Sequence, residues 1–248
     1  MFTPELYSVQ GRVSCAVALV LNPPPVDFRN PEPFEPGGTA GAILTEAYEA
    51  VRGGAPVVMR EICRSLGLTP GAPYSHFEST LHLEDVIAYN GLLSLARSIG
   101  IAVDPTLGPS ERLLAASHAY REWATRESAL FGFVFPTSGG RRESPFTTHV
   151  RTAAVAVAVP TTCALRDGWD AGTFSRPGRG PDAFPVEIPG IVVLSPAEAR
   201  IANALWATVH GTVVLELTIG THDGWDDRRE MFEWMVSTAM SAHLSTGA

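Results

Sequence analysis

The chain has 248 residues, 45% of them hydrophobic, which allows one large domain or a small and a medium domain and excludes general disorder. Its net charge of −8 argues against a protein that coats nucleic acid or an anionic membrane, although a small basic surface is compatible with it. All 18 basic residues are arginine, so arginine, histidine and backbone amides are the groups available for binding phosphate.

The cysteines and the hydropathy of the chain favour the cytoplasm. Cys15, Cys63 and Cys163 have no metal-ligand spacing, and their odd number suits a reducing compartment. No apolar run reaches the roughly 18 residues of a membrane span. Residues 13–21 could pass for the core of a signal peptide, but their flanks are poor. We therefore expect a cytoplasmic protein with no membrane contact, no bound metal and no cofactor.

The first 40 residues differ from the rest of the chain. Six prolines between positions 23 and 36 prevent a helix there. We expect residues 1–40 to form an N-terminal arm, either disordered or packed on the body.

Three helices are predicted next, in residues 41–87. Apolar residues at helical spacing predict the first from about Ala40 to Gly53. The second is predicted from Val57 to Leu66, with Gly67 in a tight turn. A very short third helix is predicted from Thr69, as its N-cap, to about His76. Ser79 is then predicted to cap a longer fourth helix. This order predicts a helix-turn-helix.

Residues 88–248 also show helical periodicity, so the predicted fold class is all-α. One helix is expected to end near Arg126, and the aromatic run 130–135 must be buried. Residues 147–166 predict a helix kinked or split at Pro160. Residues 172–194, which are rich in proline and glycine, predict an irregular connection.

Two long apolar helices are predicted at the C-terminus. Ser195 and Glu198 form a capping box for the first, which should run to about Ile219. Asp227 lies near the start of the second, which should reach Leu244. Their apolar faces could form a four-helix interface between two copies of the chain or an ordinary intramolecular core.

Two motifs carry a family resemblance. Arg60-Glu61-Ile62-Cys63-Arg64-Ser65-Leu66-Gly67-Leu68-Thr69, followed by Gly71 and Tyr74-Ser75-His76-Phe77, strongly resembles the DNA-binding domain of the TetR family of transcriptional regulators. Trp206-Ala207-Thr208-Val209-His210-Gly211 looks like the Trp-x-x-x-His-Gly helix of one class of TetR C-terminal domains. Together with a similarity over 119–135, the resemblance covers most of residues 41–248.

The resemblance implies a surface that binds double-stranded DNA. A short third helix would enter the major groove, where small residues let the backbone approach the DNA. Base-facing and phosphate-facing positions fall on Arg60, Thr69, Pro70, Gly71, Ala72, Tyr74, His76 and Thr80. Phe77 would fill the small core beneath them. The alternative is that these aromatic residues are ordinary core and that Arg60 lies on a solvated face.

The resemblance also implies a homodimeric, ligand-responsive repressor, with a small-molecule effector held in the C-terminal domain. Such cavities are mostly apolar with a few polar groups. The candidate ligand-binding residues are His118, Tyr120, Trp123, Phe131, Phe135, Trp206 and His210. The alternative for Trp206 and His210, four residues apart on one helix face, is a packed core.

Three features favour a second hypothesis, in which the DNA-binding domain has decayed and the body binds or transforms a small molecule. Pro73 lies inside the third helix, and Thr80 stands where the family commonly has a lysine. Between Ile43 and Val86, three arginines face six acidic residues, a net charge of −3. The sequence contains no nucleophile elbow, metal-ligand spacing or phosphate-binding glycine loop, so no catalytic residue is predicted.

Overall fold

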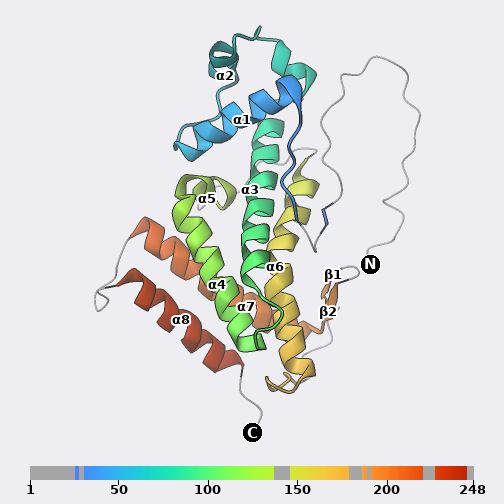
Figure 1. The fold of residues 1–248 in the computed structure, drawn as a ribbon, viewed down its shortest axis with the longest axis vertical. Helices are drawn as coiled ribbons and strands as arrows, with labels where there is room; N and C mark the ends of the chain where they lie inside the picture. The colour runs from blue at the N-terminus through green and yellow to red at the C-terminus, as the bar shows by residue number, and fades with distance from the viewer. Residues whose placement is uncertain are drawn as a thin grey trace, which may run out of the picture.

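The computed structural model describes residues 26–27, 31–136, 146–178, 186–188, 191–219 and 227–244. The described residues are mostly helical, as the sequence predicts, with one short two-stranded sheet (Figure 1). The apolar stretch 13–21 lies outside them. The order of the main elements is α1 (Gly38–Arg52), α2 (Met59–Leu66), α3 (Thr80–Ala102), α4 (Pro109–Arg126), α5 (Ser128–Val134), α6 (Thr147–Asp170), β1 (Val186–Ile188), β2 (Val192–Leu194), α7 (Pro196–Thr218) and α8 (Arg228–His243).

The head consists of α1, α2, the turn that follows α2, and the first turns of α3. Gly67 ends α2 in the left-handed region at φ 65°, where glycine is favoured because it has no Cβ. Ser79 caps α3 by accepting the His82 N–H at 3.1 Å, as predicted. Phe77 has no exposed surface and belongs to the buried cluster that includes Ile43 and Leu83, also as predicted.

The predicted third helix is shorter and begins later than expected. The structure has a four-residue 3₁₀ turn, η2 (Ala72–Ser75), and the Thr69 side chain caps nothing there. The Thr69 carbonyl accepts the Ala72 N–H at 3.0 Å, and the Pro73 carbonyl accepts the Phe77 N–H at 2.9 Å. Because Pro73 lies in the first turn of η2, its missing N–H disrupts no existing bond. In an α-helix begun at Pro70, the Pro73 ring would crowd the Thr69 carbonyl, which disfavours that longer helix.

Helix α3 runs from the head into the body and connects the two (Figure 1). Its polar residue Asn90 is buried, and it binds the arm that precedes α1. The Asn90 Oδ1 accepts the Phe34 N–H, and the Asn90 Nδ2 donates to the Phe34 carbonyl, each at 2.8 Å. An ion pair between Glu32 and Arg97 adds a second contact. Residues 31–37 of the predicted arm therefore pack on α3.

Helices α4 to α8 form the body around the lower part of α3 (Figure 1). Helix α6 is not split at Pro160 but continues through it to Asp170. Burial of Val157, Val159 and Leu165 on either side of the proline holds both halves in helical conformation despite the lost hydrogen bond. Ser195 and Glu198 form the predicted capping box of α7.

The segment 172–194 is not entirely irregular. Strands β1 and β2 pair antiparallel, with Val186 opposite Leu194 and Ile188 opposite Val192. Ile188, Val192 and Leu194 are buried in one cluster with residues of α6 and α7. The β-branched residues and this apolar surface stabilise a hairpin that the high proline content of the segment concealed.

Candidate functional site

The residues predicted to contact DNA lie at one end of the molecule, on α2, η2, the first turn of α3 and the turns that connect them (Figure 1). Arg60, Thr69, Pro70 and Gly71 are exposed, and Tyr74 is 51% exposed. Ala72, His76 and Thr80 are half-buried. A core residue has little exposed surface, so an exposure of 51% does not support the alternative that Tyr74 belongs to the core.

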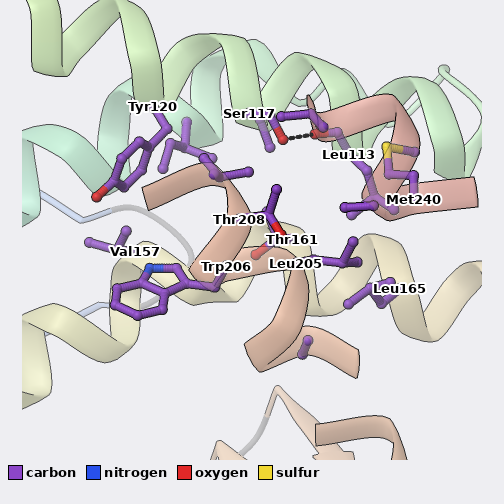
Figure 2. A pocket seen from close by; sticks show the side chains of 16 residues that line it. Leu113, Ser117, Tyr120, Val157, Thr161, Leu165, Leu205, Trp206, Thr208 and Met240 are labelled. Atoms are coloured by element: carbon purple, nitrogen blue, oxygen red, sulfur yellow. Dashed lines mark hydrogen bonds between the residues drawn. The ribbon is translucent and has the colours of Figure 1, made fainter. Parts of the chain in front are cut away.

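A small apolar cavity, the inner chamber, lies between the helices of the body (Figure 2). It has a volume of about 60 Å³. Its walls come from five helices, and they consist of Ile99 on α3; Leu113, Ala116, Ser117 and Tyr120 on α4; Val157, Thr161 and Leu165 on α6; Ala202, Leu205, Trp206, Thr208 and Val209 on α7; and Val236, Ala239 and Met240 on α8.

Each aliphatic hydroxyl that lines the inner chamber already donates a hydrogen bond to a backbone carbonyl of its own helix. Ser117 donates to the Leu113 carbonyl at 2.8 Å, Thr161 to Ala158 at 2.9 Å and Thr208 to Ala204 at 3.1 Å. Because each hydroxyl carries a single proton, these groups can offer a ligand only acceptor lone pairs. The chamber therefore presents a mostly apolar surface with few free hydrogen-bond donors.

Beside the chamber lies an aromatic cluster of Tyr120, Phe131, Phe135, Trp206 and His210. The centroids of the contacting rings are 4.9 to 6.4 Å apart, and Trp206 stacks on His210 with an angle of 8° between the rings. The Tyr120 hydroxyl and His210 Nδ1 are hydrogen-bonded at 2.7 Å. Burial raises the pKa of Tyr120 and lowers the pKa of His210, because it penalises the charged form of each side chain.

A second cavity, the outer groove, adjoins the inner chamber. It has a volume of about 400 Å³ and lies between α6, the hairpin and α7. Val157, Thr161, Ala202 and Trp206 line both cavities, so they form a common wall. Among the described residues that line the groove, Glu187 is the one charged side chain.

The predicted ligand-binding residues divide into two groups. Five of the seven form the aromatic cluster, and of these Tyr120 lines the inner chamber, Phe135 the outer groove and Trp206 both. His118 lies instead against Phe232, with its Nε2 3.8 Å from Glu233. Trp123 is buried and donates to Ser94 at 3.1 Å. Neither His118 nor Trp123 lines the inner chamber or the outer groove.

Sequence reasoning missed a buried ion pair between α4 and α7. Arg121 on α4 donates to both carboxylate oxygens of Glu216 on α7, at 2.8 and 2.7 Å, and the Glu216 side chain is 3% exposed. The position of Glu216 between Leu215 and Leu217 in an apolar helix was a usable signal. No comparable signal marked Ser117, Thr161 or Thr208, whose roles depend on which helices meet.

Helices α7 and α8 leave apolar surface exposed. Leu215 is 37% exposed, Ile219 64% and Trp234 53%. A Cβ added at Gly211 would meet no heavy atom within 4 Å. These positions are therefore available for contact with another molecule.

Two classes of site are not found in the described residues. They contain no group of three His, Cys, Asp or Glu side chains suited to a metal ion. None of their helices is both long enough and apolar enough to cross a membrane.

A comparison with protein families assigns most of the body to a known domain family. The family model "Tetracyclin repressor-like, C-terminal domain" matches residues 113–239, about half of the chain. A comparison with curated proteins found no match.

Several solved structures share the fold. A protein of unknown function from Rhodococcus sp. RHA1 is 21% identical with a TM-score of 0.64, over 86% of this chain and 99% of that one. A tetR-family regulatory protein from Rhodococcus RHA1 is 20% identical with a TM-score of 0.58, over 84% and 98%. The ketosteroid transcriptional regulator KstR2 of Mycobacterium tuberculosis is 16% identical with a TM-score of 0.52, over 87% and 99%.

Proposed function

The chain belongs to the TetR family of transcriptional regulators, and from this premise we propose that it is a cytoplasmic, homodimeric repressor. It binds an operator in double-stranded DNA and releases it when a small-molecule effector occupies the body. The family match and the exposed predicted contact residues of the head support the proposal.

The observation that carries the proposal is the course of α3. Leu83, near the start of this helix, is buried in the core of the head, and Ile99, near its end, lines the inner chamber. One continuous helix therefore touches both the DNA-binding end and the cavity. A ligand that displaces the lower part of α3 changes the position of the head, which is a rigid-body mechanism of control.

In the proposed complex, each head places η2 in a major groove. Gly71 and Ala72 allow close approach of the backbone, Arg60 reaches a base edge, and Tyr74 and His76 contact phosphates. Thr69, Pro70 and Thr80 complete the surface. Two heads of a dimer would read half-sites one helical turn, about 34–36 Å, or multiples of it apart. Ligand binding alters that spacing.

We assign the dimer interface to the exposed apolar face of α7 and α8. Gly211 lies on α7 with open space around it, so a second copy can approach its backbone closely. A Gly211→Leu protomer should fold because a Cβ at this position meets no heavy atom within 4 Å and Gly211 lies within a helix, where leucine is a favourable residue. It should fail to dimerise when examined by sedimentation, and a Gly211→Leu protein that remains a dimer would place the interface elsewhere.

The decisive experiment measures binding to duplex DNA from upstream of the protein's own gene over a salt series, with a random duplex as control. Arg60→Ala should weaken selective binding by about 1–3 kcal/mol and leave the dimer intact. Arg97→Ala, which removes an exposed arginine outside both the head and the proposed dimer interface, is the matched control and should have little effect. Equal binding by wild type and Arg60→Ala would remove Arg60 from the contact surface.

A second candidate is a family member whose head no longer binds DNA and whose body binds or transforms a small molecule. It is favoured by the short 3₁₀ turn at η2 and by the acidic balance of the head. Absence of selective DNA binding at low salt, by a folded dimer, would establish this candidate in place of the repressor.

A further inference from the structure

We propose that the effector is an uncharged, elongated apolar molecule that spans both cavities, with one end in the inner chamber and the remainder in the outer groove. This inference rests on the proposed effector site in the body. The inference specifies the chemical class of the ligand and places it against Trp206, which lines both cavities (Figure 2).

The shape of the ligand follows from the sizes of the two cavities. The inner chamber, at about 60 Å³, has room for only a few heavy atoms, whereas the outer groove has about 400 Å³. The two share the wall of Val157, Thr161, Ala202 and Trp206. A compact molecule that fits the chamber would leave the groove empty, and one that fills the groove alone would not reach α4 or α8. A ligand that occupies both must be long and narrow at one end.

The absence of charge follows from the lining. Of the described residues that line the chamber, none is charged, and in the groove Glu187 is the one that is. An anion in the chamber would therefore be desolvated without a cation to pair with it, which is strongly unfavourable. In the groove, an anion would meet the carboxylate of Glu187. A cation in the chamber would meet only neutral oxygens.

Trp206 is suited to be the central contact. Its ring stacks on His210, while 46% of the residue stays exposed. Its neighbours Val157 and Ala202 are apolar, and the hydroxyl of Thr161 is bonded within its own helix. The exposed indole surface offers apolar contact area between the two cavities, and burial of that surface would stabilise an apolar ligand.

The test uses the folded full-length protein and the neutral fluorescent probe N-phenyl-1-naphthylamine, displaced by small competitors. The competitors are 1-decanol, decanoate and 1-hexanol, which separate head-group charge from length. We expect 1-decanol to displace the probe at concentrations at least tenfold lower than either of the others. Decanoate that competes as well as 1-decanol would overturn the uncharged class, and 1-hexanol that competes as well would overturn the elongated shape.

Two variants locate the site. Ala202→Phe fills the common wall and should weaken probe binding at least tenfold, whereas Ala171→Phe, at an exposed position after α6, should change it less than twofold. Unchanged binding by folded Ala202→Phe would overturn the location.

The second variant is Trp206→Phe. Energy transfer from tryptophan to the bound probe should fall in this variant, and unchanged transfer would also contradict the site. If Ala202→Phe does not fold, this second measurement decides.

These outcomes are separate from the test of the repressor. A protein that binds 1-decanol at the Ala202 wall but no DNA would refute the proposed function and retain the ligand class. A protein that binds its operator selectively but prefers decanoate would retain the function and refute the ligand class.

Discussion

The head and the body of this protein carry their predicted functions in different ways. The head presents side chains outward from short elements, with Arg60 and Tyr74 exposed and Phe77 filling the core beneath them. The body turns its groups inward, where Tyr120, His210 and Trp206 meet from distant parts of the chain.

The head and the body also differ in where their charged side chains lie. Arg60 and Arg64 of the head are exposed on α2. The body buries the Glu216 carboxylate and pairs it with Arg121 at two points. The geometry of a surface site depends mainly on the local backbone, whereas the geometry of an internal site depends on how all the surrounding helices pack. We therefore expect substitutions to unfold the body more readily than the head.

The largest effect is expected from breaking the buried ion pair. Arg121→Ala leaves the Glu216 carboxylate buried without a partner, and this should lower the free energy of unfolding by about 3–5 kcal/mol. Urea unfolding measures the change. Arg229→Ala, which removes an exposed pair with Glu233 on α8, is the matched control and should leave the free energy of unfolding nearly unchanged, because solvent screens an exposed pair. Similar losses in the two variants would show that the body does not depend on the Arg121 pair.

A smaller effect is expected where the arm joins the body. Asn90→Ala removes both hydrogen bonds to the Phe34 backbone and should destabilise the protein by about 1–3 kcal/mol, because two partly buried backbone groups lose their partners. Thermal unfolding reports the loss. Arg97→Ala, which breaks the exposed pair of the same arm with Glu32, should cost less than about 1 kcal/mol. A neutral Asn90→Ala would mean that the arm contributes nothing to stability.

In the head, two glycines form a matched pair. Gly67→Ala forces a side chain into the left-handed region at φ 65° and should destabilise the head by about 1–2 kcal/mol. Gly71 has φ −86° and open space around it, so Gly71→Ala should leave stability unchanged. Urea unfolding of both variants tests this difference. If Gly71→Ala retains full stability but loses DNA binding, the loss reflects the surface rather than the fold.

The smallest effect concerns pH and the aromatic cluster. Burial lowers the pKa of His210, so above about pH 6.5, the value in an unfolded chain, the residue is neutral in both states and its contribution to stability is complete. Below that pH the unfolded chain binds a proton that folded His210 resists, and stability falls. Urea unfolding at pH 7.5 and 5.5 should show a smaller decrease for His210→Phe than for wild type. An equal decrease would assign the pH dependence to other groups, among them His149, whose pKa burial also lowers.

The sequence by itself determined the local structure. Gly67, Ser79 and the capping box of Ser195 and Glu198 act through neighbours within four residues, so the ends of their helices could be read directly. Phe77 in the core of the head followed from the family motif. The third helix was predicted to begin at Thr69, as in the family, although the sequence also showed Pro73 inside it; the structure forms only the short η2 turn there.

The tertiary structure alone decided the site in the body and the shape of its cavities. The five predicted aromatic residues assemble because α4, α5 and α7 meet, but His118 and Trp123, from the same helix as Tyr120, lie away from both cavities. The hairpin formed because α6 and α7 supply an apolar surface for Ile188 and Val192. Such contacts join residues far apart in the chain, and their free energy depends on which surfaces meet, which periodicity within one segment does not specify.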